Sequence, residues 1–298
     1  MNRPTAGDWT RMIALSAIWG AAFVNIRVAL GGFGPLTVAA LRIAVGGAAL
    51  LVLARMMGQR LPSFRDRARR GPILGMAVFS NALPFSLLAW GQQHVASGFA
   101  GLTMAAVPLF TLLLAARFLP GERLTPGRVV GLVLGGGGVV LLVGPGALAA
   151  SGADAEAAGR LACIAAALSY AVGAIITRLC PPTPLAALSA STLLVAMAMI
   201  VPLALAVEGL PGAASPAAWL SVAYLGLMPT AAATLLLIAI ATSAGPNFLA
   251  LSNYQVPVWS LLLGAAIFGE RLPASFLLAL ALILAGIAAS SLGRRRRA

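Results

Sequence analysis

The chain has 298 residues, of which 60% are hydrophobic and 9% charged, and its mean hydropathy is +0.98. A soluble domain carries about 25% charged residues, so water cannot be the solvent for most of this surface. The net charge of +13 comes from arginines that lie between apolar runs, which leaves no soluble basic domain that could bind nucleic acid.

Ten apolar segments are each long enough to cross a bilayer, which takes about 20 residues. Several begin with a proline at the first helical position, where its missing N–H costs nothing, as at Gly71-Pro72 and Thr125-Pro126. The first apolar run is too long for a signal peptide, and no cleavage site follows it. We expect helices at residues 11–30, 35–56, 72–91, 97–118, 126–144, 159–179, 184–207, 216–240, 247–268 and 273–292.

The first two helices each carry one unusual side chain. Trp19 lies mid-span, away from the interface where aromatic belts form, so it either stacks on a solute or packs in the core. Arg42 lies seven positions into its helix, and a charge at that depth is costly and usually faces a cavity or a partner. Arg42 therefore either attracts a substrate carboxylate or snorkels toward carbonyls at a helix end.

The third helix combines a polar face with a proline. Asn81, Phe85, Leu88 and Gln92 share one helical face, and Pro84 beside them removes a backbone hydrogen bond. A broken ladder is tolerated in a membrane where a cavity or a neighbour satisfies it. This pattern predicts that Asn81 and Phe85 line a cavity, while a hydrogen bond from Asn81 to another helix is the alternative.

The fourth and fifth helices add a break, a turn and a glycine stripe. Pro108 is predicted to loosen the fourth helix. Glu122 lies in a tight turn, where its carboxylate would face the positive end of the next helix, so a structural role is favoured over a coupling role. Gly131 and Gly135 to Gly138 allow close helix contact, either within the bundle or at a homodimer seam.

The second half repeats these features. Tyr170 lies mid-span like Trp19, Pro229 and Pro257 interrupt their helices, and Glu270 lies in a turn like that of Glu122. Three polar-capable residues in succession precede Pro257, and they cannot all face lipid. The residues expected to face inward there are Asn253, Tyr254 and Gln255.

The acidic residues all lie in loops or at helix ends, so none can serve as a buried proton relay or bind a cationic solute. This predicts a neutral, zwitterionic or anionic substrate. The single histidine, His94, cannot build a metal site, and no nucleophile–base set is present. We therefore expect no metal, no cofactor and no enzymatic activity.

The arginines also predict the orientation in the membrane. With the N-terminus in the cytoplasm, sixteen arginines fall at inner helix ends and three at outer ends. The excess of basic residues on the cytoplasmic side predicts a multi-pass protein of the cell inner membrane with both termini in the cytoplasm.

An internal repeat relates the two groups of five helices. Val107-Pro108 matches Val256-Pro257 at an offset of 149, and a Gly-Glu-Arg-Leu turn follows each of these helices, at residues 121–124 and 269–272. Because five is odd, the second group must enter the membrane from the opposite side. The predicted fold is all-α, with two inverted five-helix repeats (1–146 and 159–298) joined by a linker (147–158) around a central cavity.

Ser16-Ala17-Ile18-Trp19-Gly20 and the paired Gly-Glu-Arg-Leu turns resemble the EamA family of the drug/metabolite transporter superfamily, over about residues 10–143 and 160–292. Within it, the chain is similar to YddG-type exporters of aromatic amino acids and metabolites. The resemblance implies ten helices, a basket-like cavity, alternating access and export of amino acids or related solutes. A solute channel, or a nucleotide-sugar or drug transporter of the same superfamily, is the alternative. The expected partners are a small-molecule substrate and the lipid bilayer.

Overall fold

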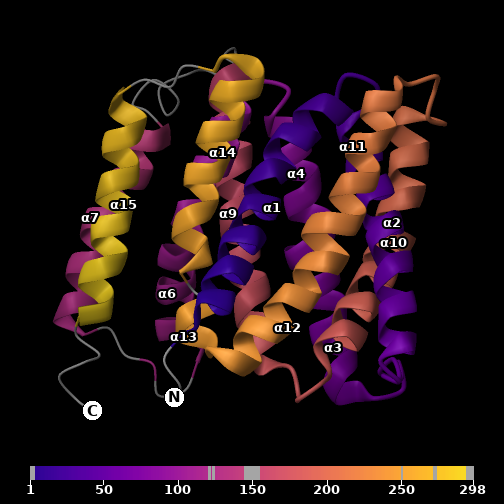
Figure 1. Ribbon diagram of the computed structural model, residues 1–298, viewed down its shortest axis with the longest axis horizontal. Helices are drawn as coiled ribbons and strands as arrows, with labels where there is room; N and C mark the ends of the chain where they lie inside the picture. The colour runs from indigo at the N-terminus through magenta and orange to yellow at the C-terminus, as the bar shows by residue number, and fades with distance from the viewer. Residues whose placement is uncertain are drawn as a thin grey trace.

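The computed structural model describes residues 4–119, 122, 125–143, 155–249, 251–270 and 274–292, and all regular structure in these ranges is helical (Figure 1). The first half contains α1 (Ala6–Ala29), α2 (Pro35–Met56), α3 (Arg67–Met76), the π-helix η1 (Ala77–Ala82), α4 (Leu83–Gly91), α5 (Ser97–Thr103), the 3-10 helix η2 (Met104–Ala106), α6 (Val107–Phe118) and α7 (Pro126–Val143). The second half contains α9 (Ala155–Leu179), α10 (Leu185–Glu208), α11 (Pro216–Gly226), the π-helix η3 (Leu227–Ala232), α12 (Ala233–Ser243), α13 (Pro246–Leu249), α14 (Ser252–Phe268) and α15 (Ala274–Leu292).

Seven helices of the described chain are long and apolar enough to cross a membrane, counting α3-η1-α4, α5-η2-α6 and α11-η3-α12 as one each. Three shorter apolar helices lie in α7, α14 and α15. Large hydrophobic side chains are exposed on the outside of the bundle, among them Val133, Leu220 and Leu278. A surface of this kind suits contact with lipid rather than water.

Three predicted helix starts lie too late in the chain, and at two of them a polar cap begins the helix earlier. α1 begins at Ala6, where Thr5 and Asp8 form a capping box. α3 begins at Arg67, where the Asp66 carboxylate accepts a hydrogen bond from the Ala68 N–H at 3.0 Å, so Pro72 lies inside the helix and not at the predicted first position. α9 begins at Ala155, so the last four residues of the predicted linker are helical, and residues 147–154 lie outside the described part.

The third helix of each half contains a six-residue π-helix at the same place. In η1 the Asn81 amide donates a hydrogen bond to the Met76 carbonyl at 3.1 Å, and in η3 the Thr230 hydroxyl donates to the Leu225 carbonyl at 3.1 Å. Both donors lie five residues after their acceptors and 149 residues from each other. A π turn leaves backbone carbonyls without a regular partner, and these side chains satisfy them.

Hydrogen bonds join the two halves at both ends of the bundle. At one end, the Glu208 carboxylate accepts from the Leu36 and Thr37 N–H groups at the start of α2. At the other end, the Gln59 side-chain oxygen accepts from the Ala187 N–H at the start of α10, at 3.1 Å. Gln59 and Glu208 are 149 residues apart, so each half caps the second helix of the other.

Glycines set the closest contacts between helices. A Cβ on Gly20 of α1 would collide with Trp259 of α14, which fixes α1 directly against the second half. A Cβ on Gly138 of α7 would lie 2.7 Å from the Ala279 carbonyl of α15. At this position the predicted glycine stripe therefore packs within the bundle.

Candidate functional site

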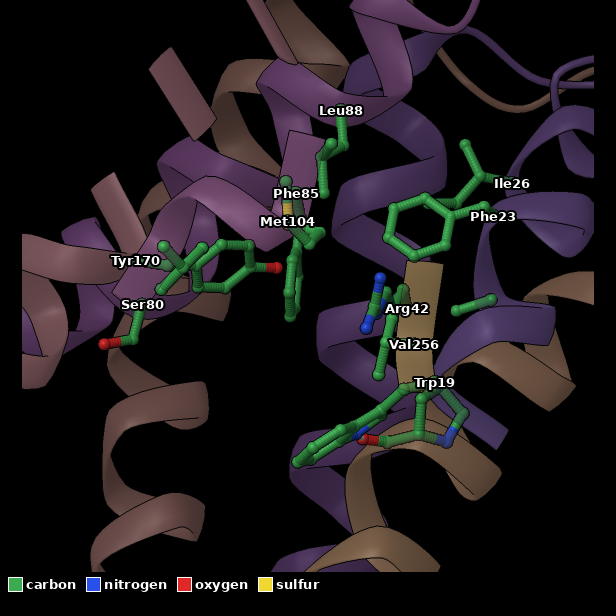
Figure 2. Close-up of a pocket in the computed structure, with 13 residues that line it drawn as sticks. Trp19, Phe23, Ile26, Arg42, Ser80, Phe85, Leu88, Met104, Tyr170 and Val256 are labelled. Carbon is green, nitrogen blue, oxygen red and sulfur yellow. Dashed lines mark hydrogen bonds between the residues drawn. The ribbon is translucent and has the colours of Figure 1, made fainter. Parts of the chain in front are cut away.

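A cavity of about 310 Å³ lies between the two halves, within the range of small-molecule binding sites (Figure 2). The first half contributes most of its walls, from α1, α2, η1, α4, η2 and α6, and the second half contributes one residue each from α9, η3 and α14. Its lining residues are Trp19, Ala22, Phe23, Ile26, Arg42, Ser80, Phe85, Leu88, Met104, Val107, Tyr170, Pro229 and Val256.

Arg42 is the one charged residue among the lining residues that the structure describes, and only 8% of it is exposed. Its guanidinium carbon lies 3.7 Å from the centre of the Phe85 ring, which is a cation–π contact. Its Nε atom is buried and has no hydrogen-bond partner among the described residues. A buried, incompletely paired cation is costly, so a group that completes its coordination would bind here with high preference.

Trp19 and Tyr170, the two mid-span aromatic residues, come from opposite halves and both line the cavity. The Trp19 indole N–H donates a hydrogen bond to the Pro229 carbonyl at 3.2 Å, which fixes the indole as a wall. The Tyr170 ring lies 6.3 Å from the Phe85 ring, and its hydroxyl points toward Phe85 and Arg42 (Figure 2). Aromatic walls beside a guanidinium fit a solute with an apolar or aromatic body and an anionic end.

The third helix presents a different polar residue than the sequence indicates. Phe85 lines the cavity as expected from the helical spacing, whereas Asn81 is not in the lining and bonds the Met76 carbonyl of its own helix. The π turn of η1 changes the angle per residue, so Asn81 and Phe85 no longer share one face. Ser80 takes the place in the lining that the regular spacing assigns to Asn81.

Gln255 of α14 binds α1 and is not among the residues that line the cavity. The Gln255 side-chain oxygen accepts a hydrogen bond from the Ser16 hydroxyl at 2.8 Å, which joins the two halves. The side chains of Asn253 and Tyr254 lie outside the described part of the chain. Val256 is the lining residue that α14 contributes.

The four prolines predicted to break helices lie at or near irregular turns. Pro84 and Pro108 are the second residues of α4 and α6, which directly follow η1 and η2, and Pro229 lies inside η3. Pro257 lies within α14. Since Pro229 also lines the cavity, at least one of these breaks is next to the candidate site. A role of the four in gating stays a prediction.

Glu270 and Glu122 both contact charged or backbone donors at helix ends. The Glu270 carboxylate accepts from the Ser97 and Gly98 N–H groups at the start of α5 and pairs with Arg27. It thus caps α5 of the other half, whereas the sequence reasoning placed it at the start of the following helix. Glu122 pairs with Arg128 at 2.7 Å.

No group of three or more histidine, cysteine or acidic side chains that could hold a metal ion occurs in the part of the chain that the structure describes. The lining offers one cation, two hydroxyl groups and aromatic rings. Such a set can bind a small organic solute, but it contains no nucleophile paired with a base.

The apolar bundle and the cavity between its halves define a solute-binding protein of the membrane. The chain belongs to the EamA-like transporter family, whose model matches it twice, at residues 10–144 and 157–292. The family and the relatives below are membrane transporters and not enzymes.

Two relatives are similar over nearly the whole chain. One is the "uncharacterized inner membrane transporter YedA" of Escherichia coli K12, 27% identical over 95% of this chain and 90% of its own. Another is the "probable terminal-alkyne amino-acid exporter" of Streptantibioticus cattleyicolor, 31% identical over 94% of this chain and 93% of its own. One solved crystal structure is also similar, with a TM-score of 0.65 and 24% sequence identity. The match covers 98% of this chain and all of the other, and it supports the fold alone.

Proposed function

We propose that this protein is a secondary transporter that exports small carboxylate-bearing metabolites, amino acids among them, by alternating access. The observation that carries the proposal is Arg42, a buried guanidinium with an unpaired Nε at the cavity between the halves. A substrate carboxylate would complete its hydrogen bonding in a site shielded from water. The similarity to a probable amino-acid exporter supports the same class of solute.

Ten crossings in two inverted repeats belong to this proposal. The seven long helices and three shorter apolar ones account for ten segments, and the two family matches divide them into five and five. In Figure 1, α1 begins and α15 ends at the same end of the molecule. The α2–α3 connection lies at that end too, and it contains exposed arginines such as Arg60 and Arg65, which favours a cytoplasmic location for both termini.

Alternating access is favoured over an open pore. A pore needs a continuous polar lining, whereas this cavity has mostly apolar walls. The bonds that join the halves at both ends give a transporter two sets of contacts, of which one would open at a time. A cationic drug is disfavoured as a substrate, because the charged group in the lining is itself a cation.

Counterflow in proteoliposomes tests the proposal. Vesicles loaded with an unlabelled amino acid should take up the same labelled amino acid transiently above equilibrium, and the initial rate should saturate. A panel of aromatic and aliphatic amino acids identifies the solutes that support this exchange. Flux that rises linearly with concentration and shows no counterflow would indicate a pore, and absence of flux for every carboxylate would refute the proposal.

A further inference from the structure

The charge inside the cavity is one-sided. Among its thirteen lining residues Arg42 is the sole ionisable residue that is charged at neutral pH, and none is acidic. A free amino acid brings both a carboxylate and an ammonium group, and each needs a partner when it leaves water. The lining residues that the structure describes supply a charged partner for the first group and no charged partner for the second.

Neutral acceptors are the other groups that bind an ammonium ion, and the described lining offers the Ser80 and Tyr170 hydroxyl groups and backbone carbonyls. Two carbonyls of the π-helices already have protein donors. The Phe79 carbonyl accepts from the Ser169 hydroxyl of α9 at 2.9 Å, and the Pro229 carbonyl accepts from the Trp19 indole of α1 at 3.2 Å. In each case the first helix of one half satisfies the π-helix of the other. These carbonyls are therefore engaged before a solute arrives.

The position of Arg42 makes an ammonium group still less favourable. An α-ammonium is attached to the carbon next to the carboxylate, so a carboxylate bound to Arg42 would hold the two cations close together. Like charges at such a distance repel strongly away from water. The face of the Phe85 ring, which could bind an ammonium by a cation–π contact, already carries the Arg42 guanidinium.

The carboxylate of a solute, by contrast, would find hydrogen-bond donors in the cavity. Because one face of the guanidinium lies on Phe85, its terminal N–H groups point along its edge, while Nε is buried and has no partner among the described residues. A carboxylate can accept two parallel N–H bonds from such an edge. The Tyr170 hydroxyl points toward the same region (Figure 2).

We infer that the cavity recognises its solute by a carboxylate and an apolar body and does not recognise an α-ammonium group. The inference rests on the proposed function and narrows its substrate class to apolar monocarboxylates. Acids that lack a free amine, such as 2-oxo acids and N-acylated amino acids, belong to this class. They bind more tightly than the parent amino acid, because they leave no unpaired ammonium in the cavity.

Four probes with the same phenyl group separate the two charges. These are 3-phenylpropionate, N-acetylphenylalanine, phenylalanine and phenylalaninamide, each titrated against the purified full-length protein by calorimetry. The first two should bind about tenfold or more tightly than phenylalanine, since an unpaired charge is costly to bury. Phenylalaninamide, which has an ammonium and no carboxylate, should show no binding.

Two variants tie the result to Arg42. Arg42→Gln should weaken binding of both amine-free acids by about tenfold or more, and Arg42→Lys, which keeps the charge and loses the fork, should give an intermediate loss. Ser191→Ala, at the matching position of the second half, should bind as the unchanged protein does. If Arg42→Gln does not fold, Arg42→Lys still supplies the test.

Three results would overturn the inference: phenylalanine binding more tightly than both amine-free acids, phenylalaninamide binding as well as they do, or no binding by any of the four. Counterflow of amino acids is measured separately and decides the proposed function. A protein that exchanges phenylalanine and rejects 3-phenylpropionate would thus remain a transporter, but one that selects zwitterions.

Discussion

The two halves of the molecule share their helix ends and their π turns but differ in the chemistry at matching positions. The positions are 149 residues apart: Asp66 and Ser215 both cap a third helix, and Gln59 and Glu208 both cap the second helix of the other half. Arg42 faces the cavity, whereas its counterpart Ser191 is buried and donates to the Ala187 carbonyl at 2.8 Å. The shared features build the frame, and the departures from symmetry make a site with one cation.

The largest effect on stability is expected when a residue of the second half replaces its counterpart in the first half. The first helices of the two halves match at an offset of 151, which pairs Trp19 with Tyr170 and Gly20 with Ala171, and a Cβ at Gly20 would collide with Trp259. Gly20→Ala should lower the free energy of unfolding by about 1–3 kcal/mol because the packed contact must move. The reverse change, Ala171→Gly, should cost no more than about 1 kcal/mol. Thermal melting in detergent measures both, and equal shifts would contradict the close α1–α14 contact.

A second exchange concerns the caps that join the halves. The Glu208 carboxylate accepts two backbone N–H bonds, and a glutamine offers a single oxygen. Glu208→Gln should therefore destabilise the protein by about 1–2 kcal/mol. Gln59→Glu should be neutral or stabilising, because a carboxylate suits the positive end of α10. If Gln59→Glu lost as much stability as Glu208→Gln, a negative charge would not stabilise the start of α10, which would contradict the prediction.

A third pair of variants removes the donors that satisfy the π-helices. Trp19→Phe deletes the bond to the Pro229 carbonyl, and Ser169→Ala deletes the bond to the Phe79 carbonyl. Each should cost about 1 kcal/mol, because a carbonyl is left without its partner. Thr242→Ala, whose hydroxyl bonds its own helix at an exposed position, is the control and should change little. If Thr242→Ala lowered the melting temperature as much as Trp19→Phe and Ser169→Ala, the bonds to the π-helix carbonyls would not stabilise the protein more than an exposed hydroxyl does.

The smallest expected effect is a pH dependence present in one half alone. The hydrogen bond from Arg69 holds the pKa of Asp66 below its ordinary value. Its contribution to stability is therefore present above the ordinary carboxyl pKa of about 4 and is lost as the pH falls through the lowered value. Asp66→Ser, which copies the Ser215 cap, should remove this part of the acid sensitivity. Melting curves between neutral pH and pH 3 compare the two proteins, and unchanged acid sensitivity would contradict the assignment.

The sequence predicted the helices well, because long apolar runs and prolines at helix starts are local signals. Trp19, Arg42 and Tyr170 were singled out by their depth in a span and Phe85 by its helical spacing, and all four line the cavity. Asn81 was expected in the lining because regular helical geometry was assumed. It bonds its own helix instead, because one π turn changes which residues share a face.

Contacts between distant helices were beyond the sequence for a different reason. Nothing local indicates that Gln255 binds Ser16 or that Glu270 caps α5, since both depend on how the halves pack together. Ser80 carries no signal of its own either. Its place in the lining follows from the π turn beside it.

The most direct test of the account measures 3-phenylpropionate binding to the reconstituted protein and to two variants at matching positions, Arg42→Gln and Ser191→Ala. Loss of the buried guanidinium should raise the dissociation constant about tenfold or more, while loss of the Ser191 hydroxyl should leave it unchanged. Equal affinity in all three proteins would contradict a carboxylate site at Arg42.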